Sequence, residues 1–348
     1  MKSFQALFIE KEADNTSLHF RETTIDNLPE NEVTIEVHYS GINYKDGLAV
    51  LPDGKIVSEY PFIPGIDASG VVVNSKSDQF QVGDEVIVTS YDFGVSYFGG
   101  YSEFIRVPAE WVVPLPDGLS LKEAMILGTA GFTAALSVDA LEFSGVTPNA
   151  GKIAVSGATG GVGSLSSAIL SKRGFSVVAS SGKSDAKEFL EKFGVSEIVS
   201  REAFQPEKVR ALDRQLYAGA IDCVGGKPLS YLLTAVQYGG AVTTCGMSAG
   251  GKLDTTVFPF ILRGIQLFGI DSVLCPMSKR ERIWNRLATD YKLTNLESLA
   301  TEIAFSELPE SLHQVMNGGV TGRYLVKVKL IKSSVLKNKD TAFSTISD

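Results

Sequence analysis

The sequence predicts an α/β protein in which a doubly wound parallel sheet is joined to a second, β-rich domain. Hydrophobic residues make up 44% of the 348 residues, charged residues 21%, and 34 are glycines, a composition typical of α/β proteins with many tight turns. From about residue 120 onward, helical segments alternate with short apolar strands, which indicates a parallel sheet with crossover helices. The chain before residue 120 has the pattern of strands, which predicts the second domain.

The first third is expected to form short strands. The segment EVTIEVHYS (32–40) alternates apolar and polar side chains, and GVVVN (70–74) and DEVIVTS (84–90) are β-branched runs bounded by Gly and Asp. No segment long and periodic enough for a helix occurs before about residue 120.

Helices and strands alternate in the rest of the chain. A helix is expected over 120–141 and an amphipathic helix over 279–291, and a last strand over 322–331. The apolar strands between them are expected at 152–158, 176–181, 219–225, 240–246 and 265–271. Residues 332–348 are polar and unpatterned, so we expect a tail or arm there.

The length favours two domains. The simplest division assigns 1–126 and 293–348 to the β-rich domain and 127–292 to a nucleotide-binding domain inserted into it. The formal net charge of −8 argues against a nucleic-acid partner, because phosphate binding needs a basic surface.

The cysteines and the apolar runs of the sequence also indicate the cellular compartment. Cys223, Cys245 and Cys275 form no C-x-x-C pair, which indicates a reducing environment. No leader pattern and no run of about 18 apolar residues is found, so we expect a cytoplasmic protein without a membrane partner.

A glycine-rich turn joins a strand to a helix at residues 157–163, GATGGVG. In that context Gly160 would let the backbone approach a pyrophosphate and Gly163 would let the helix pack on the strand, while the helix N-terminus supplies N–H groups. The helix is expected to begin near Ser164, and Ala158 occupies the place of the first glycine of the usual motif. An ordinary tight turn is the alternative.

The next strand ends in VVASSGKSD (177–185), where a dinucleotide site for NAD has an acidic residue for the ribose. Ser180, Ser181, Gly182 and Lys183 stand there instead. A hydroxyl and an ammonium attract a 2′-phosphate, so the cofactor is expected to be NADPH; the alternative is that Lys183 begins a solvated helix. Arg201, after the following strand, could stack on the adenine or pair with the phosphate.

With these residues in view, the chain resembles the medium-chain dehydrogenase/reductase superfamily along nearly its whole length, and most of all its quinone-oxidoreductase-like branch of the YhdH/YhfP type, which includes acrylyl-CoA reductase. The motifs that carry the resemblance are GINYKDGLAV, PFIPGIDASGVV, VGDEV, GTAGFTAA, ATGGVGS, SGK and FPFILRG. The resemblance implies a GroES-like catalytic domain, a Rossmann domain, NADPH and a homodimer.

The resemblance also implies a set of site residues. The positions that match the cofactor site of the branch are Tyr44, Thr159, Gly160, Gly161, Val162, Ser181, Gly182, Lys183, Arg201, Ile261 and Ser272. Tyr44 would face the nicotinamide, and Asn43 and Asp67 are candidates for polar contacts in catalysis. Ile261 alternatively packs in a core.

Zinc-dependent members of the superfamily have a His-Glu pair where this chain has Ile66 and Asp67. A catalytic zinc needs about three N, S or O ligands from the protein, and His19, His38 and His313 are far from any cysteine in sequence. We therefore expect no metal.

The sequence thus predicts a zinc-independent NADPH-dependent reductase that delivers hydride to the conjugated C=C of an α,β-unsaturated acyl thioester, acrylyl-CoA above all. A quinone or general enone reductase remains an alternative, as does a non-catalytic NADPH-binding or sensor protein. For a CoA ester, the candidate cations at the cleft mouth are Arg263, Lys279, Arg280 and Arg323.

Overall fold

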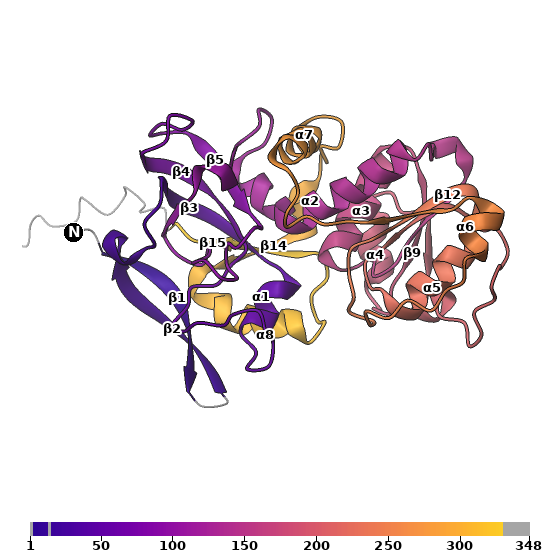
Figure 1. The fold of residues 1–348 in the computed structure, drawn as a ribbon, viewed down its shortest axis with the longest axis horizontal. Coiled ribbons are helices and arrows are strands. Elements are labelled where there is room, and N and C mark those ends of the chain that lie inside the picture. Colours follow the sequence, from indigo (N-terminus) through magenta and orange to yellow (C-terminus); the bar gives the residue numbers. More distant parts are fainter. Residues whose placement is uncertain (1–2, 13–14, 330–348) are drawn as a thin grey trace, which may run out of the picture.

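The computed structural model describes residues 3–12 and 15–329 of the chain. Two sheets lie side by side, with α2 (Leu121–Phe143) and α7 (Met277–Ala288) near their junction (Figure 1). The predicted tail at 332–348 lies outside the described residues. The α/β class, with a parallel sheet and a separate β-rich part, is as the sequence predicts; the described residues form a sheet of seven strands, a sheet of six and a two-stranded ribbon.

The first sheet is mixed and belongs to the β-rich part. Its strand order is β14-β15-β3-β4-β5-β7, with β6 paired to β3. The strands are β3 (Val33–Ile42), β4 (Asp67–Ser75), β5 (Glu85–Thr89), β6 (Phe104–Val107), β7 (Val112–Pro114), β14 (Ala300–Ala304) and β15 (Arg323–Lys327). The C-terminal strand β15 runs antiparallel to β3 in the centre of this sheet, so the end of the described chain returns to the first domain.

Two features of this part go beyond the sequence prediction: a ribbon of strands that had not been placed individually, and a helix where none was expected. β1 (Ser3–Glu12) and β2 (Asn15–Thr24) form an antiparallel ribbon of their own, and α1 (Tyr44–Ala49) is a helix before residue 120. A six-residue helix is too short to produce a periodic sequence pattern. It packs on α8 (Leu308–Met316), where a Cβ on Gly47 would lie 2.4 Å from Sδ of Met316.

The second sheet is wholly parallel, with the order β10-β9-β8-β11-β12-β13. Its strands are β8 (Lys152–Val155), β9 (Ser176–Ser180), β10 (Glu197–Val199), β11 (Tyr217–Asp222), β12 (Val236–Thr244) and β13 (Gln266–Gly269). The order reverses between β8 and β11, and ligands of doubly wound sheets bind at that point, at the carboxyl ends of the strands.

Helices cover both faces of the parallel sheet, as crossover connections require. They are α3 (Gly161–Lys172), α4 (Ala186–Glu191), α5 (Gly226–Ala235) and α6 (Phe258–Arg263), besides α2 and α7. Ile153 and Val155 pack in one core with residues of α2, α3 and α7, whereas Ala154 between them packs in another core with α5. Alternate residues of β8 thus fill two separate apolar layers.

The helix α2 has an apolar composition and a length that a membrane span would also satisfy, contrary to the sequence expectation. However, 83% of that stretch is buried inside the protein, as in the core helix of a globular domain. A non-helical Gly128, at φ +50°, breaks α2 near its start.

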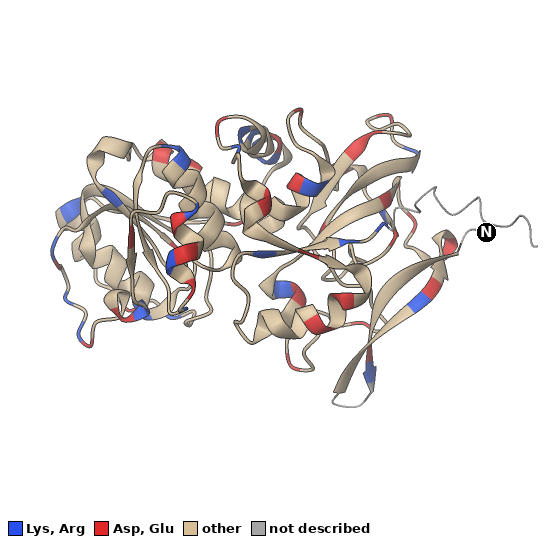
Figure 2. Ribbon diagram, turned by 180° about the vertical axis from the view of Figure 1, so that it is seen from behind, with Lys and Arg blue, Asp and Glu red and all other residues tan. Residues whose placement is uncertain are grey.

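Acidic and basic residues are interspersed over the helices and strands of both parts rather than gathered on one (Figure 2). On the side seen in Figure 2, residues 3–12 and 15–329 show no face dominated by Lys and Arg, and the absence of a nucleic-acid partner stays a prediction.

Candidate active site

The glycine-rich turn follows β8 and leads into α3 at the reversal point of the sheet. Gly157 has φ +60°, a conformation that favours glycine, and a Cβ on Gly163 would lie 2.3 Å from the carbonyl oxygen of Gly157. The close helix–strand packing expected of Gly163 is therefore present. Two details differ from the sequence prediction: the tight turn is made by Gly157 rather than at the place of Ala158, and the helix begins at Gly161 rather than near Ser164.

The hydroxyl-and-cation cluster lies at the carboxyl end of β9, beside this turn. The Thr159 Oγ1 and Ser181 Oγ atoms are 2.9 Å apart, and the backbone N–H of Lys183 donates to Ser181 Oγ at 3.2 Å. Arg201 lies over Gly182, where a Cβ would come 3.0 Å from the guanidinium carbon. The structure therefore brings the predicted residues of strands β8, β9 and β10 together in one place.

Lys183 also reaches the other domain. Its ammonium donates to the carbonyl of Val320 and to Thr321 Oγ1, which in turn donates to Asp185 Oδ2 at 3.1 Å. Burial lowers the pKa of Lys183, Asp185 opposes this, and the nearby Arg201 lowers it further. Two cations this close repel each other, so an anion placed between them would be stabilised by both.

The catalytic candidates lie on the turn between β3 and α1. The Asn43 side chain donates to Asp67 Oδ2 at 2.7 Å, and its backbone N–H donates to Asp46 Oδ2 at 2.8 Å. Tyr44, the first residue of α1, is 51% exposed. The carboxylates of Asp46 and Asp67 hold the turn in place, and the Tyr44 side chain stays exposed, where a ligand could contact it.

Asp67 is fully buried on β4 and both of its oxygens are already bonded. It accepts from the backbone N–H of Thr129 at 3.0 Å and from Thr129 Oγ1 at 2.5 Å, besides Asn43. Gly128 is required here, since a Cβ would lie 2.3 Å from Asp67 Oδ2. The carboxylate therefore orients Asn43 and the kink of α2, and this geometry suits a positioning residue better than a base.

Arg323 completes this cluster, which we call the cleft network (Asn43, Asp46, Asp67, Thr129 and Arg323). Arg323 is 3% exposed at its side chain, donates to the Ile42 carbonyl at 2.8 Å and to Asn43 Oδ1 at 2.9 Å, and lies 3.6 Å from Asp67 Oδ2. Its Cδ would be 3.2 Å from a Cβ on Gly161. One guanidinium thus links the turn between β3 and α1 to the start of α3.

Asp46 also has an altered acidity. Burial, and then the charge of Asp67, raise the pKa of Asp46 to about 7 despite hydrogen bonds from the Asn43 and Ile66 backbones. Two carboxyl groups are buried close together, and the repulsion between their charges favours the protonated form of Asp46. Sequence reasoning missed Thr129 and the role of Arg323 because both are distant from Asn43 in the chain, and it missed Asp46 although its spacing of three residues from Asn43 is that of a helix capping box.

Two predicted site residues, Ile261 and Ser272, belong to other segments and lie at different ends of the parallel sheet. Ile261 is 72% exposed on α6, whose Arg263 donates to the carbonyl of Val236 at the amino end of β12. It is thus on the side of the sheet opposite the carboxyl ends. Ser272 is buried just past the carboxyl end of β13, and its carbonyl accepts from Arg280 at 3.0 Å.

The prediction that four cationic side chains lie at the mouth of a cleft is wrong for three of them. Arg263, Arg280 and Arg323 are at most 9% exposed, and each donates to backbone carbonyls. Arg280 also lies over the rings of Tyr91 and Phe132. Buried guanidinium groups of this kind brace the fold, and only Lys279 is exposed.

Comparison with known proteins assigns the family. Residues 29–117 match the family described as alcohol dehydrogenase GroES-like domain, and residues 161–288 match the family described as zinc-binding dehydrogenase. The chain belongs to the medium-chain dehydrogenase/reductase superfamily. The resemblance stated from the motifs is confirmed.

Two relatives align over almost the entire described chain. The YhfP protein of Bacillus subtilis, whose name suggests a quinone oxidoreductase, is 50% identical over 326 residues, covering 93% of this chain and 99% of its own. Acrylyl-CoA reductase AcuI of Ruegeria pomeroyi is 42% identical over 327 residues, with coverages of 93% and 99%.

Solved structures agree in fold. A crystal structure of YhfP with NAD bound superimposes with a TM-score of 0.93 at 50% identity, covering 94% of this chain and 100% of that one. The YhdH oxidoreductase of Salmonella enterica in complex with NADP gives a TM-score of 0.91 at 44% identity, with coverages of 93% and 100%. The predicted fold class, GroES-like plus Rossmann, is confirmed.

The residues present do not fit a zinc ion, although the name of one matching family mentions zinc. Ile66 cannot ligate, and both oxygens of Asp67 are bonded within the protein. Across residues 3–12 and 15–329, no three His, Cys, Asp or Glu side chains gather where they could hold a metal. Metal independence stays a prediction for solution experiments.

Proposed function

We propose that this protein is an NADPH-dependent reductase of the conjugated C=C bond of an α,β-unsaturated acyl thioester, with acrylyl-CoA as substrate and propionyl-CoA as product. The observation that carries the proposal is the cluster of Ser181, Lys183 and Arg201 beside the glycine turn, with no carboxylate in the ribose position. The relatives named as acrylyl-CoA reductase and the relative in complex with NADP support it.

The chain's own residues fit the cofactor. The turn from Thr159 to Val162 and the first N–H groups of α3 would bind the pyrophosphate, and Lys183 and Arg201 would bind the 2′-phosphate. Tyr44 is exposed where the two domains meet and would contact the nicotinamide; Ile261 and Ser272 remain proposals from the family resemblance. When bound, NADPH supplies the hydride.

Addition of hydride to the β-carbon of the thioester places negative charge on the carbonyl oxygen, as an enolate. Hydrogen-bond donors can stabilise that oxygen without a metal. The Tyr44 hydroxyl is a candidate to position the substrate and to return a proton to the α-carbon, while Asn43 and Asp67 set the turn that carries it.

The test uses NADPH deuterated at C4 with acrylyl-CoA as substrate. Deuterium is expected on C3 of the propionyl product, and Tyr44→Phe should slow turnover less than Tyr44→Ala if the ring chiefly positions the reactants. Deuterium absent from C3, or efficient oxidation of saturated alcohols, would refute the reaction.

A quinone reductase is the second candidate, because the 50% identical relative YhfP bears that name. A comparison of kcat/KM for acrylyl-CoA and for a small quinone separates the two. NADPH binding without turnover across a panel of enones and quinones would instead favour the non-catalytic alternative.

Metal independence is part of the proposal. Activity should survive dialysis against a chelator, and the purified protein should contain no stoichiometric zinc by atomic absorption, since no ligand set is present among the described residues. Activity lost on chelation and restored by zinc would contradict this.

We also retain three expectations from the sequence as proposals: a homodimer, a cytoplasmic location, and domains comprising 1–126 with 293–348 and 127–292. The first domain boundary falls within α2, two residues before the break at Gly128. Light scattering and limited proteolysis test the oligomer and the boundaries, and fractionation of the cells tests the location.

A further inference from the structure

Two cysteines that are distant in sequence become neighbours at the carboxyl edge of the parallel sheet. β11 and β12 are paired in parallel with Asp222 opposite Thr244 at their ends, so Cys223 and Cys245, which directly follow these strands, are neighbours. The ladder continues there, because the N–H of Cys245 donates to the Asp222 carbonyl at 3.0 Å. The backbones stay close beyond it: a Cβ on Gly246 would lie 2.1 Å from the Cys223 carbonyl oxygen.

The two thiols are close enough to be joined. Neighbouring strands lie about 4.8 Å apart, and disulfides form between Cα atoms about 4.4–6.8 Å apart. Cys245 Sγ lies 3.5 Å from the carbonyl oxygen of Asp222, the residue that precedes Cys223. Both cysteines are partly exposed, whereas Cys275 is buried in another part of the chain.

The pair also borders the cofactor turn. A Cβ on Gly157 would lie 3.7 Å from Cβ of Cys223 and 2.8 Å from Val224 Cγ1. In a doubly wound sheet the strands on this side of the reversal point carry the second half of a dinucleotide. Cys223 therefore lies next to the glycine that shapes the turn, and a change at Cys223 is expected to disturb it.

We propose that Cys223 and Cys245 are a redox-sensitive thiol pair, and that a peroxide converts them to a disulfide that weakens binding of the dinucleotide. Nothing in the proposed reduction reaction uses these thiols. The formation of the disulfide is independent of the proposed function, and only the effect on NADPH binding rests on it.

The chemistry balances with hydrogen peroxide as oxidant. Cys245 attacks one peroxide oxygen as a thiolate, the O–O bond breaks, and a sulfenic acid and hydroxide form. The Cys223 sulfur then attacks the sulfenic sulfur, the S–S bond forms, the S–O bond breaks, and water leaves. The two sulfurs together lose two electrons, and the two peroxide oxygens gain them and end as two waters.

The roles of the two sulfurs follow from their surroundings. The hydrogen bond with Cys245, together with burial and the charge of Asp222, raises the pKa of Cys223 well above its ordinary value. Cys223 therefore keeps its proton until the second step, and the first attack is assigned to Cys245.

The disulfide should disturb the cofactor turn. Drawing two sulfurs to bonding distance moves the Cys223 side chain, which packs against Gly157, and the segment that follows, where Gly225 N–H donates to Asp222 Oδ2 at 2.8 Å. We expect the affinity for NADPH to fall by about 5- to 150-fold, the usual range for coupled sites. By linkage, saturating NADPH should shift the equilibrium with dithiothreitol toward the thiols by the same factor.

The experiment treats the reduced full-length protein with hydrogen peroxide and then counts thiols and maps peptides without reductant. Free thiols should fall from the three of the sequence to one, with a Cys223–Cys245 cross-link that dithiothreitol reverses. Cys275→Ser is the matched control and should still form the cross-link, whereas Cys223→Ser and Cys245→Ser should not. A persistent count of three, or cross-links that contain Cys275 or join two chains, would overturn the thiol pair.

NADPH affinity is measured separately, by quenching of intrinsic fluorescence, on the reduced and the oxidised wild type. Weaker binding only in the oxidised form supports the proposal, and equal affinity overturns its second part. If NADPH binds neither form, the proposed cofactor site fails, while the thiol count still decides the fate of the pair.

Discussion

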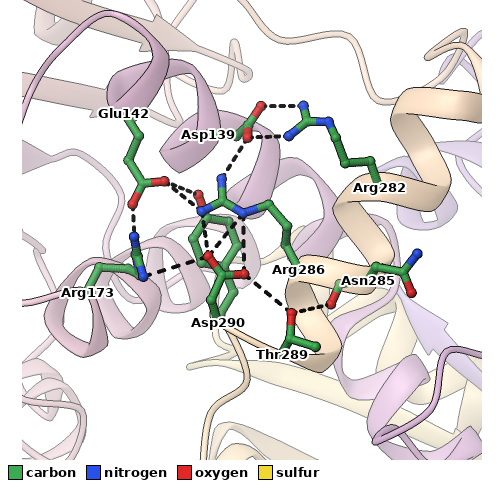
Figure 3. A network of polar contacts seen from close by, with 9 residues as sticks. Asp139, Glu142, Arg173, Arg282, Asn285, Arg286, Thr289 and Asp290 are labelled. Carbon is green, nitrogen blue, oxygen red and sulfur yellow. Dashed lines mark hydrogen bonds and ion pairs between the residues drawn. The ribbon is translucent and has the colours of Figure 1, made fainter.

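Two charged networks, both assembled from distant parts of the chain, differ in burial and in role. In the network of Figure 3, which we call the surface network, Arg286 of α7 contacts Asp139, Glu142 and Asp290 at 2.6–2.8 Å. Its charged side chains, those of Asp139, Glu142, Arg173, Arg282, Arg286 and Asp290, are 14–51% exposed. In the cleft network, the Asp67 and Arg323 side chains are 0% and 3% exposed.

Burial explains why only the cleft network constrains the site. Removing charges from water costs free energy that only full pairing offsets, so the bonded carboxylate of Asp67 is fixed in one geometry. Exposed pairs are screened and adaptable. The surface network fastens α7 to α2 and to the end of α3, whereas the cleft network determines where Asn43 and Tyr44 lie.

The comparison predicts the largest effect for the loss of a buried partner. Asp67→Ala leaves Arg323 buried without its ion-pair partner, and we expect the free energy of unfolding to fall by about 3–5 kcal/mol in urea titrations. Asp139→Ala, the matched change in the surface network, should cost clearly less. Equal losses would show that burial does not distinguish the networks.

The pH dependence of stability should have opposite signs in the two networks. The pKa of Asp46 is raised from 3.8 to about 7 in the folded protein, so its contribution is fully present below pH 3.8 and is lost as the pH rises to about 7. A tenfold change in proton affinity corresponds to about 1.4 kcal/mol, which makes this loss on the order of 4 kcal/mol.

Asp139 should behave in the opposite way. Burial alone would raise its pKa, but hydrogen bonds from Arg282 and Arg286 outweigh burial and lower it. Its contribution is present above the unfolded pKa and is lost as the pH falls through the folded one. Asp46→Asn should therefore remove a stability decline between about pH 4 and pH 7, and Asp139→Asn should remove an acid-side decline. Unchanged pH profiles of urea unfolding would contradict both assignments.

The Lys183 side chain is intermediate in exposure between the two networks and lies beside the glycine-rich turn. Lys183→Ala should weaken NADPH binding by about 1.5–3 kcal/mol, the contribution of a hydrogen bond to a charged group, with little effect on NADH. Lys187→Ala, an exposed lysine on α4, is the control. Equal efficiency of the wild type with both cofactors would contradict the 2′-phosphate assignment, a sharp question because a relative has been solved with NAD.

The smallest effect is expected at Arg282, whose side chain is 51% exposed although it makes two 2.8 Å contacts to Asp139. Arg282→Ala should reduce the free energy of unfolding by less than about 1 kcal/mol, and the difference should shrink further at high salt. A loss as large as that of Asp67→Ala would show that two-point contact outweighs exposure.

The local features of the site could be predicted from the sequence. Val177 to Ser180 form β9, the glycine turn follows β8, and Leu165 and Ile169 are buried on one face of α3. Each depends on neighbours within a few residues, where apolar periodicity and glycine content report directly on backbone conformation. The absence of a carboxylate at the position that would contact the ribose could be predicted in the same way, because that position directly follows the end of one strand.

The contacts between distant segments could not be predicted. Arg263, Arg280 and Arg323 were expected at a cleft mouth, yet all three are buried. Their burial could not be predicted, because an arginine in a sequence does not reveal which carbonyls surround it. Asp46 became evident only when α1 was seen, since a six-residue helix has no detectable period.

By itself, then, the sequence determined the doubly wound sheet, the glycine-rich turn and the cation where NAD sites have a carboxylate, because strands, turns and helix starts are encoded within short windows. Only the tertiary structure decided that Asp67 meets Arg323, that Lys183 reaches Val320, and that Cys223 lies beside Cys245. Those contacts depend on the order of the strands and on the return of β15 to β3. Both result from many small packing interactions distributed over the whole chain.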